Sequence, residues 1–281
     1  MKLTIKKISV GIVIIFALIG FFFAVVFVGM QFGLFNVRGS IAERNQFFTG
    51  AATSTPTYPC VDQSKTVCEW NETPEFVVVN GGLTKDASII TRVAGETRVT
   101  PRMIASVVVP EQIRFFTSER EVFKRYFEPL KILGSLSQFS LGVSGIKQET
   151  AQKIEEYALD KTSPFYPGED IAPLISYKEG TNHDEELYNR LTDAKDHYYS
   201  YLYTAIFIKE LDSQWKASGF DISQNPDAIV TLFNLGFQKS QPKNDPLSGG
   251  ATIITGGKKY TYGELGADFY RSNELRDIFP N

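Results

Sequence analysis

The N-terminal part of the chain contains an apolar run that is long enough to cross a lipid bilayer. Lys2, Lys6 and Lys7 precede residues 8–37, and no charged residue follows until Arg38. The run has about 30 residues, roughly 45 Å as a helix, and is therefore longer than the ~20 helical residues that are needed to cross a bilayer core. A secretory signal peptide has a shorter apolar region followed by a small-residue cleavage site. We therefore expect an uncleaved transmembrane anchor.

The charges around this run predict its orientation. Lysines on the N-terminal side of an anchor favour a cytoplasmic N-terminus. We expect a cytoplasmic tail at 1–7, a single-pass anchor at 8–37 in the cytoplasmic membrane, and a periplasmic or extracellular remainder. Cys60 and Cys68 are close in sequence, and an oxidising compartment would join them in a disulfide. Two free thiols remain the alternative.

The rest of the sequence predicts a stalk followed by a mainly helical domain. Residues 38–98 are expected to form a juxtamembrane stalk with a small β-element, because EFVVVNGG and ASIITRVAG have strand character around Asn-Gly-Gly. Residues 99–281 begin with a Thr-Pro helix start and predict a mainly α (α+β) domain with a hairpin at Gly256-Gly257. The predicted helices are 102–116, 119–133, 148–158, 184–217, 226–237 and 264–275.

Charge and histidine content exclude several classes of function. The net charge of −3 over 281 residues provides no polybasic field for nucleic acid. His183 and His197 are the only histidines, and no Cys/His ligand spacing surrounds them. We therefore expect neither a metal ion nor another cofactor.

A carboxylate interrupts an apolar helix face within MIASVVVPEQIRFF, residues 103–116. Burial favours the neutral form of a carboxyl group, which is the form that a general acid needs at neutral pH. The alternative is a structural glutamate paired with Arg114 or Arg120. The face has the i, i+3, i+4 spacing of one side of a helix and consists of Ile104, Val107, Val108, Glu111 and Phe115.

Three stretches together resemble the soluble lytic transglycosylases of the lysozyme-like superfamily. FSLGVSGIKQETAQKI, residues 139–154, is similar to the family's glycine motif. AIVTLFNLGF, residues 228–237, is similar to the later Tyr-Asn-Ala-Gly helix. IASVVVPEQIRF stands where the family has its catalytic glutamate helix, so the order of the three stretches matches. The matching positions outside the glutamate helix are Ser140, Gly142, Gly145, Ile146, Lys147, Thr150, Ala151, Asn234 and Gly236.

The resemblance covers about residues 100–240 and implies a lysozyme-like fold with peptidoglycan lytic transglycosylase activity. Glu111 would protonate the glycosidic oxygen between N-acetylmuramic acid (MurNAc) and N-acetylglucosamine (GlcNAc). It would then act as the base that activates the sugar's own 6-hydroxyl group. Peptidoglycan glycan strands are the implied partner. The residues expected to bind substrate are Gln112, Ser140, Gly142, Gly145, Lys147, Asn234 and, as stacking surfaces one turn apart, Tyr199 and Tyr203.

The chain departs from the family pattern in three places. Gln112 replaces the serine after the catalytic glutamate, Lys147 replaces a glutamine, and Phe233 replaces a tyrosine. Because of these departures, the alternative function of a catalytically inactive peptidoglycan-binding or scaffold module on the same fold remains. A lysozyme-type hydrolase is also open, and it would require a second acid from Glu119, Glu121 or Glu128. The Ser-x-x-Lys spacing at residues 144–147 also fits penicillin-binding enzymes, but their Lys-Thr-Gly motif is absent.

Overall fold

The computed structural model describes residues 16–22, 59–115, 140–193 and 195–281. Within these ranges the chain is mainly helical and has two small antiparallel sheets of two strands each. The expectation of a mainly α protein with a small β-hairpin is therefore confirmed.

The expected membrane anchor and one expected helix fall largely or wholly outside the described residues. Of the anchor at 8–37, only 16–22 are described, and they are helical. Across the described part of the chain, no helix is both long enough and apolar enough to cross a membrane. The helix expected at 119–133 lies outside the described residues.

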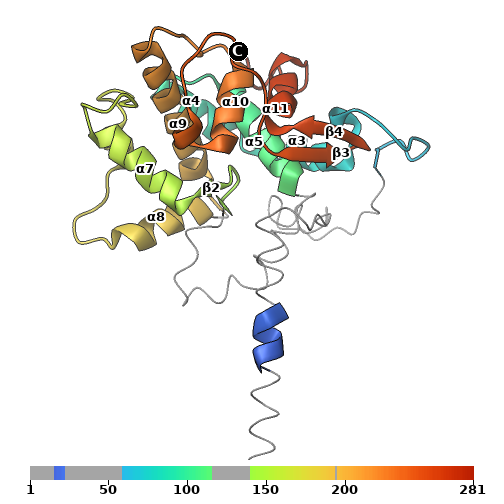
Figure 1. Ribbon diagram of the computed structural model, residues 1–281, viewed down its shortest axis with the longest axis horizontal. Helices are drawn as coiled ribbons and strands as arrows, with labels where there is room; N and C mark the ends of the chain where they lie inside the picture. The colour runs from blue at the N-terminus through green and yellow to red at the C-terminus, as the bar shows by residue number, and fades with distance from the viewer. Residues whose placement is uncertain (1–15, 23–58, 116–139, 194) are drawn as a thin grey trace, which may run out of the picture.

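The described elements follow one another as helices, short 3-10 turns (η) and two hairpins (Figure 1). The helices are α3 (Pro74–Lys85), α4 (Ala87–Thr97), α5 (Pro101–Phe115), α7 (Gln148–Leu159), α8 (His183–Thr192), α9 (Tyr198–Ala217), α10 (Pro226–Leu235) and α11 (Tyr262–Arg271). The 3-10 turns are η1 (Trp70–Glu72), η4 (Ala172–Ile175) and η5 (Phe237–Lys239). The strands are β1 (Ser140–Leu141) with β2 (Ile146–Lys147), and β3 (Thr252–Thr255) with β4 (Lys258–Thr261).

α5 lies in the centre of the core, where it packs against α3, α4, α9, α10 and α11 (Figure 1). This position explains why α5 is apolar on nearly all sides. Pro110 lies inside the helix without ending it. Proline has no N–H, so the carbonyl of Ser106 lacks its helical donor. Gly266 of α11 lies against that carbonyl, because a Cβ at Gly266 would be only 2.5 Å from the Ser106 oxygen.

Arg102 joins the other end of α5 to the end of α11. Its fully buried guanidinium donates to the carbonyls of Tyr270 (3.2 Å) and Ser272 (2.9 Å), and also to those of Phe269 and Glu274. The last carbonyls of a helix have no partner within the helix. Arg102 therefore caps the C-terminus of α11.

The β-element expected before residue 99 was a wrong prediction, because this part of the chain forms α3 and α4. The Thr73 side chain accepts a hydrogen bond from Phe76 N at 3.3 Å, and Pro74 occupies the first helical turn. The valines of α3 favour strands locally, but tertiary burial of one helix face overrides that preference. The buried residues of both helices have helical spacing: Phe76, Val79 and Leu83, then Ile90, Val93 and Thr97. Both helices share the core of the expected 99–281 domain.

The helix expected at 184–217 is divided into α8 and α9. Asp193 ends α8, and its Oδ1 accepts hydrogen bonds from Lys195 N (2.8 Å) and Asp196 N (3.2 Å). Such local side-chain acceptors compete with helical hydrogen bonds. Asp196 Oδ1 in turn accepts from Tyr198 N at 3.0 Å, where α9 begins.

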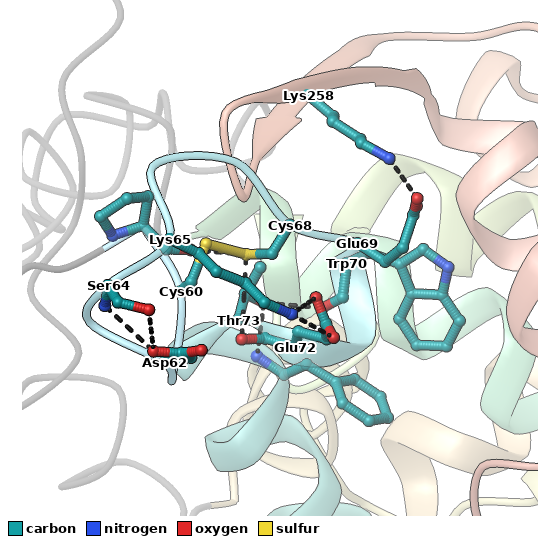
Figure 2. Close-up of a disulfide and its surroundings, with 12 residues drawn as sticks. Cys60, Asp62, Ser64, Lys65, Cys68, Glu69, Trp70, Glu72, Thr73 and Lys258 are labelled. Atoms are coloured by element: carbon teal, nitrogen blue, oxygen red, sulfur yellow. Dashed lines mark hydrogen bonds and ion pairs between the residues drawn. A yellow bond between two sulfur atoms is a disulfide. The ribbon is translucent and has the colours of Figure 1, made fainter.

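The Cys60–Cys68 disulfide is present, as expected, and it closes a loop against the β3–β4 hairpin. Cys68 N donates to Gly256 O at 2.8 Å. Gly256 has φ +58°, and a Cβ there would lie 2.5 Å from the Cys68 oxygen. Figure 2 shows Lys258 of β4 pointing to Glu69, which follows the disulfide. The disulfide loop therefore supports the hairpin that leads into α11.

Candidate functional site

A pocket of about 200 Å³ lies where α5, β2, α7, α9, α10 and α11 meet. Residues of three motifs that are far apart in the sequence line this pocket: the Glu111 helix, the glycine motif and the Asn234 helix. The lining residues are Glu111, Arg114, Gly145, Ile146, Lys147, Thr150, Phe207, Phe233, Asn234, Leu235, Gly236 and Tyr262.

Glu111 lies at the pocket with its carboxylate bound to an arginine of the same helix. Arg114 Nη2 donates to Oε1 at 2.9 Å and to Oε2 at 2.8 Å. The Glu111 side chain is 12% exposed and the Arg114 side chain 24% exposed. The pairing with Arg114 that the sequence left open is therefore formed, and a pocket lies beside it. The ion pair and the opening occur together.

The glycine motif brings backbone directly against the acid. Gly145 has φ +66°, and a Cβ at this position would lie 2.2 Å from Glu111 Oε1. Only glycine permits this conformation and this approach at little cost. Gly142 has φ +64° and lies against Leu191 O and Ser200 Oγ instead. Gly145 therefore shapes the pocket, while Gly142 shapes the turn behind it.

Tyr262, the first residue of α11, lies beside Glu111 and is fully buried. Its hydroxyl donates to Val107 O at 3.0 Å. Burial raises the pKa of Tyr262 well above its ordinary value, and the negative charge of Glu111 raises it further. Tyr262 is therefore protonated at neutral pH, and its one hydroxyl hydrogen is donated to the backbone of α5.

The opposite wall comes from α10. The ring of Phe233 packs edge-on against Phe207, with centroids 5.1 Å apart. Asn234 Oδ1 accepts from Ala251 N at 2.8 Å, so this oxygen holds the segment before β3. Asn234 thus fixes the segment before β3 and also lines the pocket.

Gln112 and Ser140, both predicted to bind substrate, are not among the residues that line the pocket. Gln112 is fully buried, and its Nε2 donates to Val143 O, which ties α5 to the glycine motif. The backbone of Ser140 pairs opposite Lys147, and its side chain lies outside the described part of the structure. The rival nucleophile Ser144 is also fully buried, and its Oγ donates to Ser200 O at 3.1 Å.

The expected stacking role of Tyr199 and Tyr203 needs correction, because neither residue lines the pocket. Tyr203 is fully buried, and its hydroxyl donates to Glu155. The ring of Tyr199 faces Arg190, whose guanidinium carbon is 4.5 Å from the ring centroid. α9 packs against both α7 and α8, and its two tyrosine rings meet Glu155 of α7 and Arg190 of α8 instead of the pocket.

Several pocket residues could not be assigned from the sequence. Phe207 lies in the middle of an apolar helix and looks like any core aromatic residue. Tyr262 follows Thr261, whose capping box with Glu264 marks a helix start, but the pattern gives no sign that this start reaches Glu111. Thr150 was recognised only as part of the glycine motif.

The pocket combines residues from α5, the glycine motif and α10. Comparisons of the chain with protein families, with curated proteins and with solved structures find no match.

Proposed function

We propose that the protein is a membrane-anchored lytic transglycosylase with a lysozyme-like domain, which cleaves the MurNAc–GlcNAc bond of peptidoglycan outside the cytoplasm. The observation that carries this proposal is the convergence of three sequence-distant motifs on one pocket. Glu111, Gly145 and Asn234 come from different parts of the chain and line the same cavity. Their order and residue types are those of the family that the sequence resembles.

The proposed reaction needs one carboxyl group. Protonated Glu111 gives its proton to the glycosidic oxygen, and the bond from that oxygen to C1 of the muramic acid breaks. The resulting carboxylate then takes the proton of the 6-hydroxyl group while that oxygen bonds to C1. The products are a 1,6-anhydro sugar and a new free 4-hydroxyl end, and Glu111 regains its proton.

The ion pair with Arg114 sets a condition for this reaction. Both carboxyl oxygens of Glu111 accept hydrogen bonds from Arg114, whereas the first step requires that Glu111 donate a proton to the substrate. Glu111 and Arg114 are one turn apart on α5, so a change in the Arg114 side chain alone can separate them. Substrate in the pocket is proposed to draw Arg114 away from Glu111 and to exclude water from the acid.

The composition of the pocket disfavours a hydrolase. A glycosidase of the usual kind requires two carboxyl groups on either side of the scissile bond. Among the described residues, Glu111 is the only carboxylate that lines the pocket. Glu119, Glu121 and Glu128 lie outside the described residues.

Digestion of purified peptidoglycan tests the proposed activity. The full chain in detergent is incubated with glycan strands, and the products are identified by mass spectrometry. We expect 1,6-anhydro muropeptides from the wild type and a loss of at least about 100-fold with Glu111→Gln, because general acid–base groups contribute that much or more. Glu156→Gln is the matched control, since Glu156 is exposed on α7 and pairs with Lys153. Reducing-end products would instead identify a hydrolase.

A non-catalytic glycan-binding module is the second candidate, and the Arg114–Glu111 pair favours it. A carboxylate whose two oxygens both accept from one arginine is charge-compensated, as in a structural ion pair. This candidate predicts that the wild type sediments with insoluble peptidoglycan and releases no product. Glu111→Gln would then leave sedimentation unchanged.

The location of the protein outside the cytoplasm has a separate test. Lys2, Lys6 and Lys7 precede the apolar run, so residues after 38 are expected on the outer side of the membrane. Protease added to intact spheroplasts should degrade this part of the chain. Its survival in intact spheroplasts, with degradation only after lysis, would show the reverse orientation.

A further inference from the structure

The pocket carries more positive than negative charge. Arg114 and Lys147 contribute two cations, and Glu111 contributes one carboxylate. Arg114 is bound to Glu111, whereas no ion pair within the described residues involves Lys147. The charge of Lys147 is therefore left for a group that enters the pocket.

The position of Lys147 strengthens its attraction for an anion. It is the last residue of β2 and directly precedes α7, and it is half-buried at the pocket wall. Thr150, in the first turn of α7, lines the same wall, and the first turn of a helix bears partial positive charge. A charge pair in a partly enclosed site interacts more strongly than one in open water.

The size of the pocket limits what can carry the anion. Pockets for drug-sized ligands are usually about 300–1,000 Å³, and this pocket measures about 200 Å³. Its enclosed part has room for one sugar-sized group, and a peptide attached to that sugar would extend through the side of the pocket that is open to solvent. The anion is therefore expected to belong to the sugar itself.

We propose that Lys147 binds the free lactyl carboxylate of a muramic acid residue, so that the site selects glycan strands without stem peptides. This inference rests on the proposed function in taking peptidoglycan as the polymer. In intact peptidoglycan the lactyl carboxyl group forms a neutral amide with the first residue of the stem peptide. Hydrolysis of that amide by water gives the lactyl carboxylate and the peptide's ammonium group. An amide hydrolase must therefore act on the strand first.

Two matched small ligands test the binding step without requiring catalysis. The probes are N-acetylmuramic acid and its lactyl methylamide, which differ at the carboxylate. Calorimetry or NMR titration of the full chain in detergent should show that the acid binds at least about tenfold more tightly, as for a charge-assisted hydrogen bond. Lys147→Gln should abolish this preference, and Lys147→Arg should retain it. Lys153→Gln, on the exposed side of α7, is the control and should leave it unchanged.

Equal binding of the acid and the amide, or a preference that survives Lys147→Gln, would overturn the inference. Digestion separates this failure from failure of the proposed function. If strands with and without stem peptides release anhydro products at equal rates, the lytic function stands and the selection by Lys147 is wrong. If neither releases product while the Lys147-dependent preference remains, the lytic function is wrong and the carboxylate site stands. Faster release from peptide-free strands, lost with Lys147→Gln, supports both.

Discussion

The two ends of α5 each hold a charged side chain in the interior, but in different surroundings. Arg102 is fully buried, and four backbone carbonyls at the end of α11 accept its hydrogen bonds. Glu111 has a side-chain partner on its own helix and faces a pocket. The first charge is held by fixed backbone atoms, and the second by a side chain that can move.

This difference teaches that burial of a charge does not by itself indicate a functional site. The Arg102 guanidinium meets backbone carbonyls at and just after the end of α11, so its role is to hold α5 and α11 together. Glu111 is adjacent to empty space and to a backbone that approaches closely only because residue 145 is glycine. The opening and the exchangeable partner, rather than burial, mark the candidate site.

Replacement of Arg102 should have the largest effect on stability. Arg102→Met removes one donor from each of four carbonyls and leaves those of Ser272 and Glu274 without a donor among the described residues. Each buried acceptor left unpaired costs about 1–3 kcal/mol. We expect a loss of at least about 3 kcal/mol in the free energy of unfolding, measured by urea denaturation of the purified chain. Arg92→Met is the control, since Arg92 is exposed and contacts only the ring of Tyr198 in the described structure. A loss for Arg102→Met as small as that for Arg92→Met would contradict the capping role.

Glu210 on α9 provides a third buried ionisable side chain for the comparison. Neither carboxyl oxygen has a hydrogen-bond partner in the described part of the chain. Burial raises the pKa of Glu210 well above its ordinary value. The folded state therefore holds this proton more tightly than the unfolded state. The stability that the proton provides is complete below the ordinary glutamate pKa and is lost as pH rises toward the folded value.

Glu210→Gln removes this titration. The variant should gain stability relative to the wild type as pH rises from 5 to 8, by roughly 1 kcal/mol or more. Urea denaturation at the two pH values measures the gain. Glu156→Gln on the surface of α7 should show little change with pH. A gain for Glu210→Gln that is the same at both pH values would mean that Glu210 is not protonated in the folded protein.

Substitution of Gly145 tests whether the backbone at this residue approaches Glu111 as closely as the structure shows. Gly145→Ala places a Cβ 2.2 Å from Glu111 Oε1 at a residue with φ +66°. We expect a loss of about 1–2 kcal/mol from the left-handed conformation, together with displacement of the acid and loss of activity. Gly81→Ala is the matched control, because Gly81 lies inside α3 with no atom within 4 Å of the added Cβ. It should stabilise the protein by about 0.5–1 kcal/mol. Equal effects of the two substitutions would refute the packing described for Gly145.

Glu111→Gln should have the smallest effect on stability and the largest on activity. The side chain retains its shape, and a partly exposed ion pair contributes only about 1 kcal/mol or less. Thermal or urea denaturation should therefore place this variant within about 1 kcal/mol of the wild type. A loss comparable to that of Arg102→Met would mean that Glu111 is a structural residue like Arg102.

Local patterns were sufficient for some elements and misleading for others. The Thr-Pro start of α5, the Gly256-Gly257 turn and the disulfide were all predicted correctly, because each depends on neighbours in sequence. The valines of α3 predict a strand locally, but the burial of Phe76, Val79 and Leu83 on one helix face is a tertiary effect. Tyr203 was interpreted as a candidate sugar-stacking residue, but the rotation of α9 directs its hydroxyl to Glu155.

The sequence by itself determined the mainly helical character of the domain, the glutamate on an apolar helix and the two glycines of the following motif. These features depend on side-chain periodicity and on local backbone freedom, and both are properties of neighbouring residues in the sequence. The sequence also offered Arg114 as one of two partners for Glu111, and the structure shows that pair. Only the tertiary structure decided that Gly145 touches the acid and that Lys147 and Asn234 line the same pocket. Those contacts join residues whose separation in space depends on how the helices pack, and no local pattern specifies that packing.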